Sequence, residues 1–223
     1  EEYRRASPFP HVVIDGLVPD TVLDQLVAEF PQPSDEWRQF DDVHQKKYGA
    51  GLLELELGPI TRNVLAEFNS ATFVDFLQVL TGIEEALIPD PYYKGGGLHQ
   101  ILAGGYLKVH ADFNLHPAFG LDRRVNVLLY LNRGWQPEWG GQLELWNRTM
   151  TCAERRIDPG FNRMVVFSIT DVAFHGHPDP LRCPPDRSRR SLAFYYYSNG
   201  RPENERSDQH KTLFQRRPTR AIS

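Results

Sequence analysis

The spacing of hydrophobic residues changes about two-fifths of the way along the chain. Up to about residue 90, apolar side chains recur three or four positions apart, which is typical of amphipathic helices. From about residue 95, short apolar runs alternate with polar positions and are separated by Gly, Pro, Asn and Asp, which is typical of strands. Helices followed by strands predict an α+β protein, mainly β, in which N-terminal helices buttress a two-sheet jelly roll, a double-stranded β-helix.

Helix boundaries can be predicted in the N-terminal part. One helix begins after Pro19 and ends before Pro31, and a second covers Pro59–Phe68 with proline at its first position. A third follows at once, with Ser70 as its N-cap and Gly82 at its C-terminal end.

The β-rich part contains several short segments with the composition of strands. They are Leu98–Leu102, Tyr106–His110, Val125–Leu131, Gly141–Trp146, Met164–Ser168 and Ser191–Ser198.

The chain shows no internal repeat and no linker-like tract, so we predict a single domain over residues 1–223. Its expected parts are a helical support (1–90), a jelly-roll core (about 91–200) and a polar surface tail (201–223) that carries Arg216, Arg217 and Arg220.

Composition narrows the class of partner. The 25 basic and 29 acidic residues give a net charge of −4, which argues against nucleic acid and anionic membranes as partners. The two cysteines, Cys152 and Cys183, are too few for a disulfide framework or a four-thiolate zinc site, and no apolar run reaches 18 residues. We therefore expect a soluble protein of a reducing compartment, the cytoplasm; the sequence does not predict an oligomeric state.

A possible pair of metal ligands ends one predicted strand. His110 and Asp112 are two positions apart, and because alternate side chains of a strand share a face, the imidazole and the carboxylate would converge. His177-Pro178-Asp179 repeats the spacing, but its prolines predict a turn.

A third ligand and an anion-binding group follow downstream. His175 or His177 would complete a set of two imidazoles and one carboxylate on one side of a metal, the arrangement of non-haem Fe(II) oxygenases. Arg189 shares a strand face with Ser191, and a guanidinium inside a barrel needs a carboxylate partner, which a bound co-substrate would supply.

These residues, in this order within a β-rich half, resemble the 2-oxoglutarate- and Fe(II)-dependent dioxygenases, specifically the prolyl 4-hydroxylase-like branch. The resemblance covers roughly residues 85–200 and extends beyond the ligands to three further segments. They are Gly104–Leu107, Arg124–Asn132 and Gly140–Trp146.

The resemblance implies that His110, Asp112 and His175 are the iron ligands. The Phe-His-x-x-x-Pro context of Phe174 and His175 favours His175 over His177, which would then be a neighbouring supporting residue.

The resemblance also implies how 2-oxoglutarate would bind. Arg189, preferred to Arg190 because of the Arg-x-Ser pattern, would pair with the distal carboxylate, and Tyr130 would donate a hydrogen bond to it. Ser191 would assist. Gln100 stands ten residues before the first ligand, where the family often has a tyrosine, and would make a polar contact with the co-substrate.

The implied activity is hydroxylation of an unactivated C–H bond of an amino-acid, peptidyl or natural-product substrate, with succinate and CO2 as co-products. Fe(II), 2-oxoglutarate and O2 would be required, with ascorbate as a possible reductant. The carboxylate of Asp112 would leave no vacant position for a halide, which favours hydroxylation over halogenation. Two alternatives remain: the same chemistry on a saccharide, and a non-catalytic metal-binding jelly-roll module, in which an inward Arg189 would have no purpose.

Several aromatic and histidine residues have less specific predictions. Trp135, Trp139 and Trp146 are expected in core or rim packing rather than in a substrate cleft. His116 is expected at the surface of a loop that could cover the metal, and His99 is expected to be a half-buried, hydrogen-bonded residue.

Overall fold

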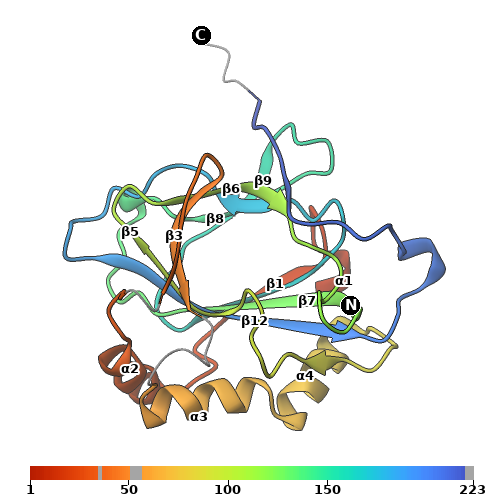
Figure 1. Ribbon diagram of the computed structural model, residues 1–223, viewed down its shortest axis with the longest axis horizontal. Coiled ribbons are helices and arrows are strands. Elements are labelled where there is room, and N and C mark those ends of the chain that lie inside the picture. Colours follow the sequence, from red (N-terminus) through yellow and green to blue (C-terminus); the bar gives the residue numbers. More distant parts are fainter. Residues whose placement is uncertain (35–36, 51–56, 219–223) are drawn as a thin grey trace.

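The computed structural model describes residues 1–34, 37–50 and 57–218. Its strands form one antiparallel sheet in the order β1-β10-β7-β12-β5-β3-β6-β11-β8-β9, with β2, β4 and β13 attached at the side. The sheet curls so that the layer of β1, β7 and β12 faces the layer of β6 and β8 (Figure 1). This curled, mainly β sheet with few helices confirms the jelly-roll prediction.

The strands are β1 (His11–Asp15), β2 (Arg38–Asp41), β3 (Gln45–Ala50), β4 (Ile88–Pro89), β5 (Gly97–Leu102), β6 (Tyr106–Ala111), β7 (Asp122–Tyr130), β8 (Leu143–Trp146), β9 (Ala153–Ile157), β10 (Arg163–Ser168), β11 (His175–His177), β12 (Ser188–Ser198) and β13 (Leu213–Phe214). The α-helices are α1 (Glu2–Arg5), α2 (Asp20–Glu29), α3 (Pro59–Phe68) and α4 (Ala71–Thr81), with 3-10 turns at Pro137–Trp139 and Glu203–Glu205.

The three longer helices confirm their predicted boundaries. The hydroxyl of Ser70 accepts a hydrogen bond from the backbone N–H of Phe73 at 3.2 Å, which caps α4. Gly82 ends α4 with φ +65°, a left-handed conformation that glycine adopts without strain. None of the helices in the described ranges combines the length and the apolar character needed to cross a bilayer.

The helices α2, α3 and α4 lie along the outer face of the layer that contains β7 and β12 (Figure 1). The alternation along β7 explains why. Val125, Val127 and Leu129 pack with the helices in the larger core, whereas the intervening Leu128 and Tyr130 pack between the two layers of the sheet. Both faces of this strand are therefore buried, and its inner face is available for a site.

Residues 1–90 are not purely a helical support, because they also contribute four strands to the sheet. β1 pairs with β10, β4 pairs with β12, and β3 lies between β5 and β6 with β2 beside it. The sequence of β3 begins Gln-Lys-Lys-Tyr, and it lacks the apolar alternation that identifies a strand.

The C-terminal segment is not a free surface tail. β13 pairs with β6, with Leu213 opposite Ala111 and Phe214 opposite His110. The side chain of Asn114 holds the approach to β13 by donating to the hydroxyl of Ser207 and the carbonyl of Asp208 and accepting from the N–H of His210. Arg216 and Arg217 follow the strand, and Arg220 lies outside the described residues. The prediction of a polar tail was wrong because β13 contains only two apolar residues, which are too few to be recognised as a strand among the polar residues of this segment.

Candidate metal centre

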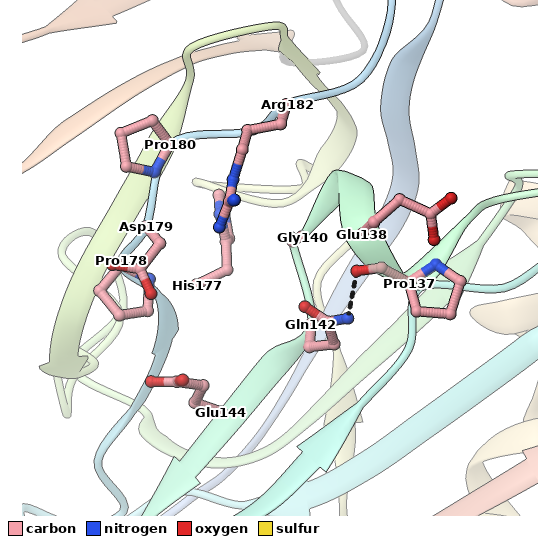
Figure 2. Close-up of a pocket in the computed structure, with 11 residues that line it drawn as sticks. Pro137, Glu138, Gly140, Gln142, Glu144, His177, Pro178, Asp179, Pro180 and Arg182 are labelled. Carbon is pink, nitrogen blue, oxygen red and sulfur yellow. Dashed lines mark hydrogen bonds between the residues drawn. The ribbon is translucent and has the colours of Figure 1, made fainter.

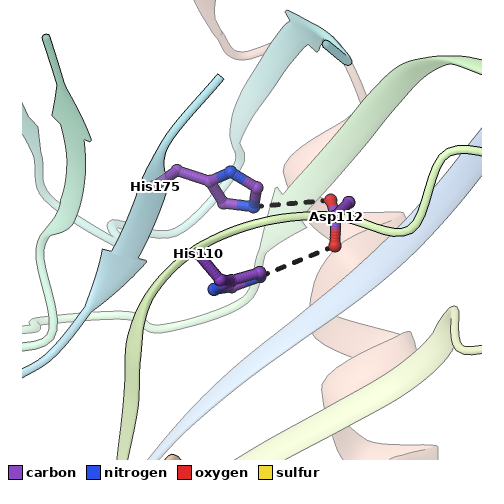
Figure 3. A group of neighbouring side chains, drawn as sticks. All are labelled: His110, Asp112 and His175. Carbon is purple, nitrogen blue, oxygen red and sulfur yellow. Dashed lines mark ion pairs between the residues drawn. The ribbon is translucent and has the colours of Figure 1, made fainter. Parts of the chain in front are cut away.

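Two facing strands bring the predicted iron ligands together. His110 is on β6, Asp112 follows the end of this strand, and His175 on β11 is directly opposite His110 in the ladder. One ligand atom from each of the three lies within 4.8 Å of the others (Figure 3). Each imidazole Nε2 is 3.5 Å from an oxygen of Asp112, and all three side chains are buried.

The backbone orients both imidazoles. Nδ1 of His110 donates to the carbonyl of Lys108 at 2.8 Å, and Nδ1 of His175 donates to the carbonyl of Ala173 at 2.9 Å. With the proton held on Nδ1, the lone pair of each Nε2 points towards Asp112. Burial and the adjacent His110 lower the pKa of His175 to about 4, so its imidazole is neutral at pH 7 and able to bind a metal.

Asp112 is held as a carboxylate. Its Oδ2 accepts a 2.7 Å hydrogen bond from the amide of Asn126 and lies 3.1 Å from Nη2 of Arg123. Burial by itself would raise the pKa of Asp112, but Arg123 and the two histidines outweigh this effect and keep the pKa well below its ordinary value. The centre therefore combines two neutral nitrogen donors and one anionic oxygen donor, a set suited to a divalent metal.

His177 does not belong to this group, and it is not in a turn. It is the last residue of β11, opposite Leu107 on β6 and 3% exposed. Neither ring nitrogen has a hydrogen-bond partner among the described residues. The prolines that follow end the strand immediately after His177, which is why the repeated His-x-Asp spacing did not predict a strand.

Arg189 and Tyr130 lie on the inner face of the sheet. Ser191 on β12 is opposite Tyr130 on β7, and Arg189 shares its face. Nη2 of Arg189 donates to the Tyr130 hydroxyl at 3.1 Å, and Nε donates to the carbonyl of Gly141 at 2.9 Å. Arg190 lies on the opposite face, with its guanidinium 5.0 Å from the centre of the Phe30 ring.

Arg189 is a buried cation without an acidic partner in the described part of the chain. It is 4% exposed, and burial lowers the pKa of its guanidinium. Gly141 makes room for it, because a Cβ added there would lie 3.1 Å from Cδ of Arg189 and 2.7 Å from the side chain of Leu181. The remaining donors of Arg189 can therefore bind an anion brought in from outside.

The expected contact of Gln100 with a co-substrate does not fit the register. Gln100 is opposite Arg190, and its amide donates to the hydroxyl of Ser188 at 2.8 Å. The adjacent His99 is opposite Ser191, so it occupies the inner face instead. Counting ten residues back from His110 crosses the turn between β5 and β6, and a count across a turn does not determine which face a residue occupies.

The remaining predictions about side chains have mixed outcomes. His116 is 4% exposed rather than on the surface, because it packs between Phe119 and Tyr197 with Nε2 3.7 Å from Asp90. His99 is half-buried and bonded to the carbonyl of Gly95, as expected. Trp146 is in the core, and the rings of Trp135 and Trp139 pack against each other at 5.3 Å beside buried apolar residues.

A hollow of about 210 Å³ opens beside Gly141 and His177 (Figure 2). Its lining includes Glu138, Glu144, His177, Asp179 and Arg182. None of the three predicted ligands lines it, and two of its three carboxylates are paired with arginines, Glu144 with Arg156 and Asp179 with Arg217.

Three inward-facing residues were missed by the sequence analysis: Arg123, Asn126 and Lys47. Asn126 is four positions before Tyr130 on β7, so the period-two rule places both on one face and could have identified Asn126. Arg123 lies beyond a bulge between β7 and β12, which changes the alternation. Lys47 belongs to the unpredicted strand β3.

Residues 96–197 match the family model of the 2OG-Fe(II) oxygenase superfamily. The matched segment includes the three predicted ligands, Tyr130 and Arg189. No sequence among the curated proteins matches the chain.

Solved structures share the fold. A prolyl-4-hydroxylase from Pseudomonas putida superposes with a TM-score of 0.60 and 19% identity over 85% of this chain and 93% of its own. A Trichoplax adhaerens prolyl hydroxylase in complex with a hypoxia-inducible-factor peptide has a TM-score of 0.58 and 19% identity over 84% of this chain and 83% of its own. HygX from Streptomyces hygroscopicus, with nickel and 2-oxoglutarate bound, has a TM-score of 0.57 and 11% identity over 91% of this chain and 92% of its own.

The family match and the jelly-roll neighbours confirm the recognition made from the sequence and the expected enzyme class, a dioxygenase. Residues 96–197, which include β5 to β12 and the three predicted ligands, are therefore similar to the 2OG-Fe(II) oxygenase superfamily in both sequence pattern and fold.

Proposed function

We propose that the chain hydroxylates an unactivated C–H bond, with His110, Asp112 and His175 holding Fe(II) and Arg189 and Tyr130 holding the distal carboxylate of 2-oxoglutarate. Succinate and CO2 are the expected co-products. The observation that carries the proposal is the pairing, inside one sheet, of a buried His-Asp-His cluster with a buried guanidinium that lacks an acidic partner in the described residues.

The residues present fit both groups. Two neutral Nε2 donors and a carboxylate match the facial triad of non-haem iron sites. Arg189, with the Tyr130 hydroxyl beside it, matches one end of a dicarboxylate. Neither ring nitrogen of His177 has a hydrogen-bond partner among the described residues, so its imidazole can donate one hydrogen bond and accept another.

Each side chain has a distinct task in this proposal. Fe(II) and 2-oxoglutarate, when bound, would supply the electrons that activate O2. The carbonyls of Lys108 and Ala173 keep the imidazoles oriented, and Asn126 and Arg123 fix the carboxylate of Asp112. Arg189 and Tyr130 orient the co-substrate from its far end, and Ser191 on the same face assists.

The expected substrate is an amino-acid, peptidyl or natural-product molecule. Two neighbours support this range, because one binds a peptide and HygX has also been solved with hygromycin B. A purely structural metal module is a weaker interpretation, because burying Arg189 without a partner would only cost stability.

Anaerobic reconstitution with Fe(II) and 2-oxoglutarate tests the proposal. We expect a weak metal-to-ligand charge-transfer band in the visible that requires both components and is absent with Zn(II). Asp112→Ala should lose the band and 2-oxoglutarate turnover to succinate. Succinate formation that survives in Asp112→Ala would contradict the assignment of the metal site.

A further inference from the structure

Lys47 on β3 faces the same interior as the predicted metal ligands. Gly49 on β3 is opposite His99 on β5, and His99 is opposite Ser191 on β12, so these three residues share the inner face. Lys47 is two positions before Gly49 on the same strand and therefore also points inwards. Its Nζ lies 5.3 Å from the centre of the Phe40 ring on β2.

Lys47 is half-buried and has no hydrogen bond or ion pair among the described residues. Its neighbour Lys46 points the other way and pairs with Asp41 at 3.5 Å. Burial lowers the pKa of Lys47 to about 8; Asp112 partly offsets this effect, and the nearby arginines add to it. An ammonium group is thus held in a place that disfavours positive charge.

Among the described residues that face the ligand cluster, the cations outnumber the carboxylates. Arg123 is paired with Asp112, and Arg189 is assigned to 2-oxoglutarate in the proposed function. Lys47 is the cation left without a counter-charge among these groups, and Arg38, which stacks on the same Phe40 ring at 4.5 Å, adds to the positive potential. An anion entering beside β3 would relieve this excess of charge.

We propose that Lys47 binds a carboxylate group of the primary substrate, so that the substrate is a carboxylate-bearing small molecule such as a free amino acid. This inference rests on the proposed function, since it assumes that Arg189 is occupied by 2-oxoglutarate. Lys47 then acts from the β3 side of the interior, apart from Arg189 and Tyr130 on β12 and β7, and fixes the distance between the substrate carboxylate and the carbon that reacts.

Competitive labelling of Lys47 tests the inference without knowledge of the substrate. The holoenzyme, loaded anaerobically with Fe(II) and saturating 2-oxoglutarate, is treated with an amine-acylating reagent, and the modified lysines are quantified by peptide mass spectrometry. Propanoate and its neutral analogue propanamide are the probes, at matched ionic strength. At about ten times its dissociation constant, propanoate should slow labelling of Lys47 about tenfold. Propanamide should have no effect, and Lys46 serves as the internal control.

The outcomes distinguish failure of the Lys47 anion site from failure of the proposed function. Equal labelling of Lys47 with propanoate and propanamide, with the charge-transfer band intact, overturns the anion site and leaves the proposed function standing. Protection of Lys47 by 2-oxoglutarate alone also overturns it, because Lys47 would then belong to the co-substrate. Absence of the band refutes the proposed function itself. In Lys47→Gln, the band and 2-oxoglutarate affinity should persist.

Discussion

The side-chain amide of Asn126 donates a 2.7 Å hydrogen bond to Oδ2 of Asp112, the oxygen that also lies 3.1 Å from Nη2 of Arg123. The carbonyl oxygen of the same Asn126 side chain accepts two hydrogen bonds from Arg123, at 2.8 and 3.0 Å. Asn126 therefore bridges the carboxylate and the guanidinium, and fixes the orientation of the expected anionic ligand.

This bridge predicts that Asn126→Ala weakens metal binding while leaving all three ligands in place. Loss of a hydrogen bond to a ligating carboxylate typically costs about 10- to 100-fold in metal affinity. Anaerobic titration with Fe(II) or Co(II) measures the effect, and thermal unfolding of the metal-free variant is the control for folding. Unchanged affinity in a folded variant would show that Arg123 alone orients Asp112.

Arg189 and Arg190 offer a matched pair for testing the co-substrate site, because adjacent residues of β12 point to opposite faces. Arg189→Met removes a buried charge-assisted contact, each such hydrogen bond being worth about 1.5–3 kcal/mol. We expect 2-oxoglutarate affinity to fall about 100-fold, since 1.4 kcal/mol corresponds to a factor of ten. Tyr130→Phe should cost about tenfold.

Isothermal titration of the metal-loaded protein with 2-oxoglutarate measures these affinities. Arg190→Met is the control and should bind 2-oxoglutarate as the unmodified chain does, because its guanidinium lies over Phe30 on the outer face. If Arg190→Met were the weaker binder of the two, the assignment of Arg189 would be wrong.

The local part of the fold could be predicted from the sequence because its determinants are local. Ser70 and Gly82 mark the ends of α4 through contacts within one turn, and the alternation along β7 separates a helix-packed face from an inner face. The same parity rule distinguished Arg189 from Arg190. His110 and Asp112 could be paired for this reason too, since both belong to one strand and its end.

The missed features depend on pairing between distant segments. β3 enters the sheet between β5 and β6, although its sequence is polar, because its inner face lies against a polar site. His116 is buried by Tyr197 and Asp90, which are far away in the sequence. The position of Gln100 was predicted by counting back from His110 across the turn before β6, and such a count does not determine which face of the sheet a residue occupies. Such pairings leave no periodic signal within the segment itself.

The contacts of Phe214 indicate that β13 supports the metal centre. Its ring lies 5.5 Å from the His110 ring and stacks on His44 at 4.2 Å. Phe214→Ala should loosen His110 and lower metal affinity several-fold, because this ring packs against the edge of the site. Leu213→Ala is the matched control, since Leu213 is 37% exposed. Equal metal affinities for the two variants, measured by the same titration, would argue against this support.

The lowered pKa of Lys47 predicts how carboxylate binding depends on pH. The ammonium form is the one that binds an anion, and its pKa is about 8 in the folded chain rather than 10.5. Protection by propanoate should therefore be complete well below pH 8 and disappear as the pH rises through about 8.

The other charged groups around Lys47 do not change in this range. Asp112 has a pKa well below its ordinary value and stays ionised, His99 has a pKa of about 3 and stays neutral, and the guanidinium groups of Arg123 and Arg189 keep their charge. The guanidinium of Arg38 lies 4.5 Å from the centre of the Phe40 ring that Lys47 also faces. The acylation rate of Lys47, followed against pH beside that of Lys46, gives the midpoint directly. An acylation midpoint near pH 10 would show that Lys47 is solvated and unaffected by the interior charges. Lys47 would then not be the group that binds a substrate carboxylate.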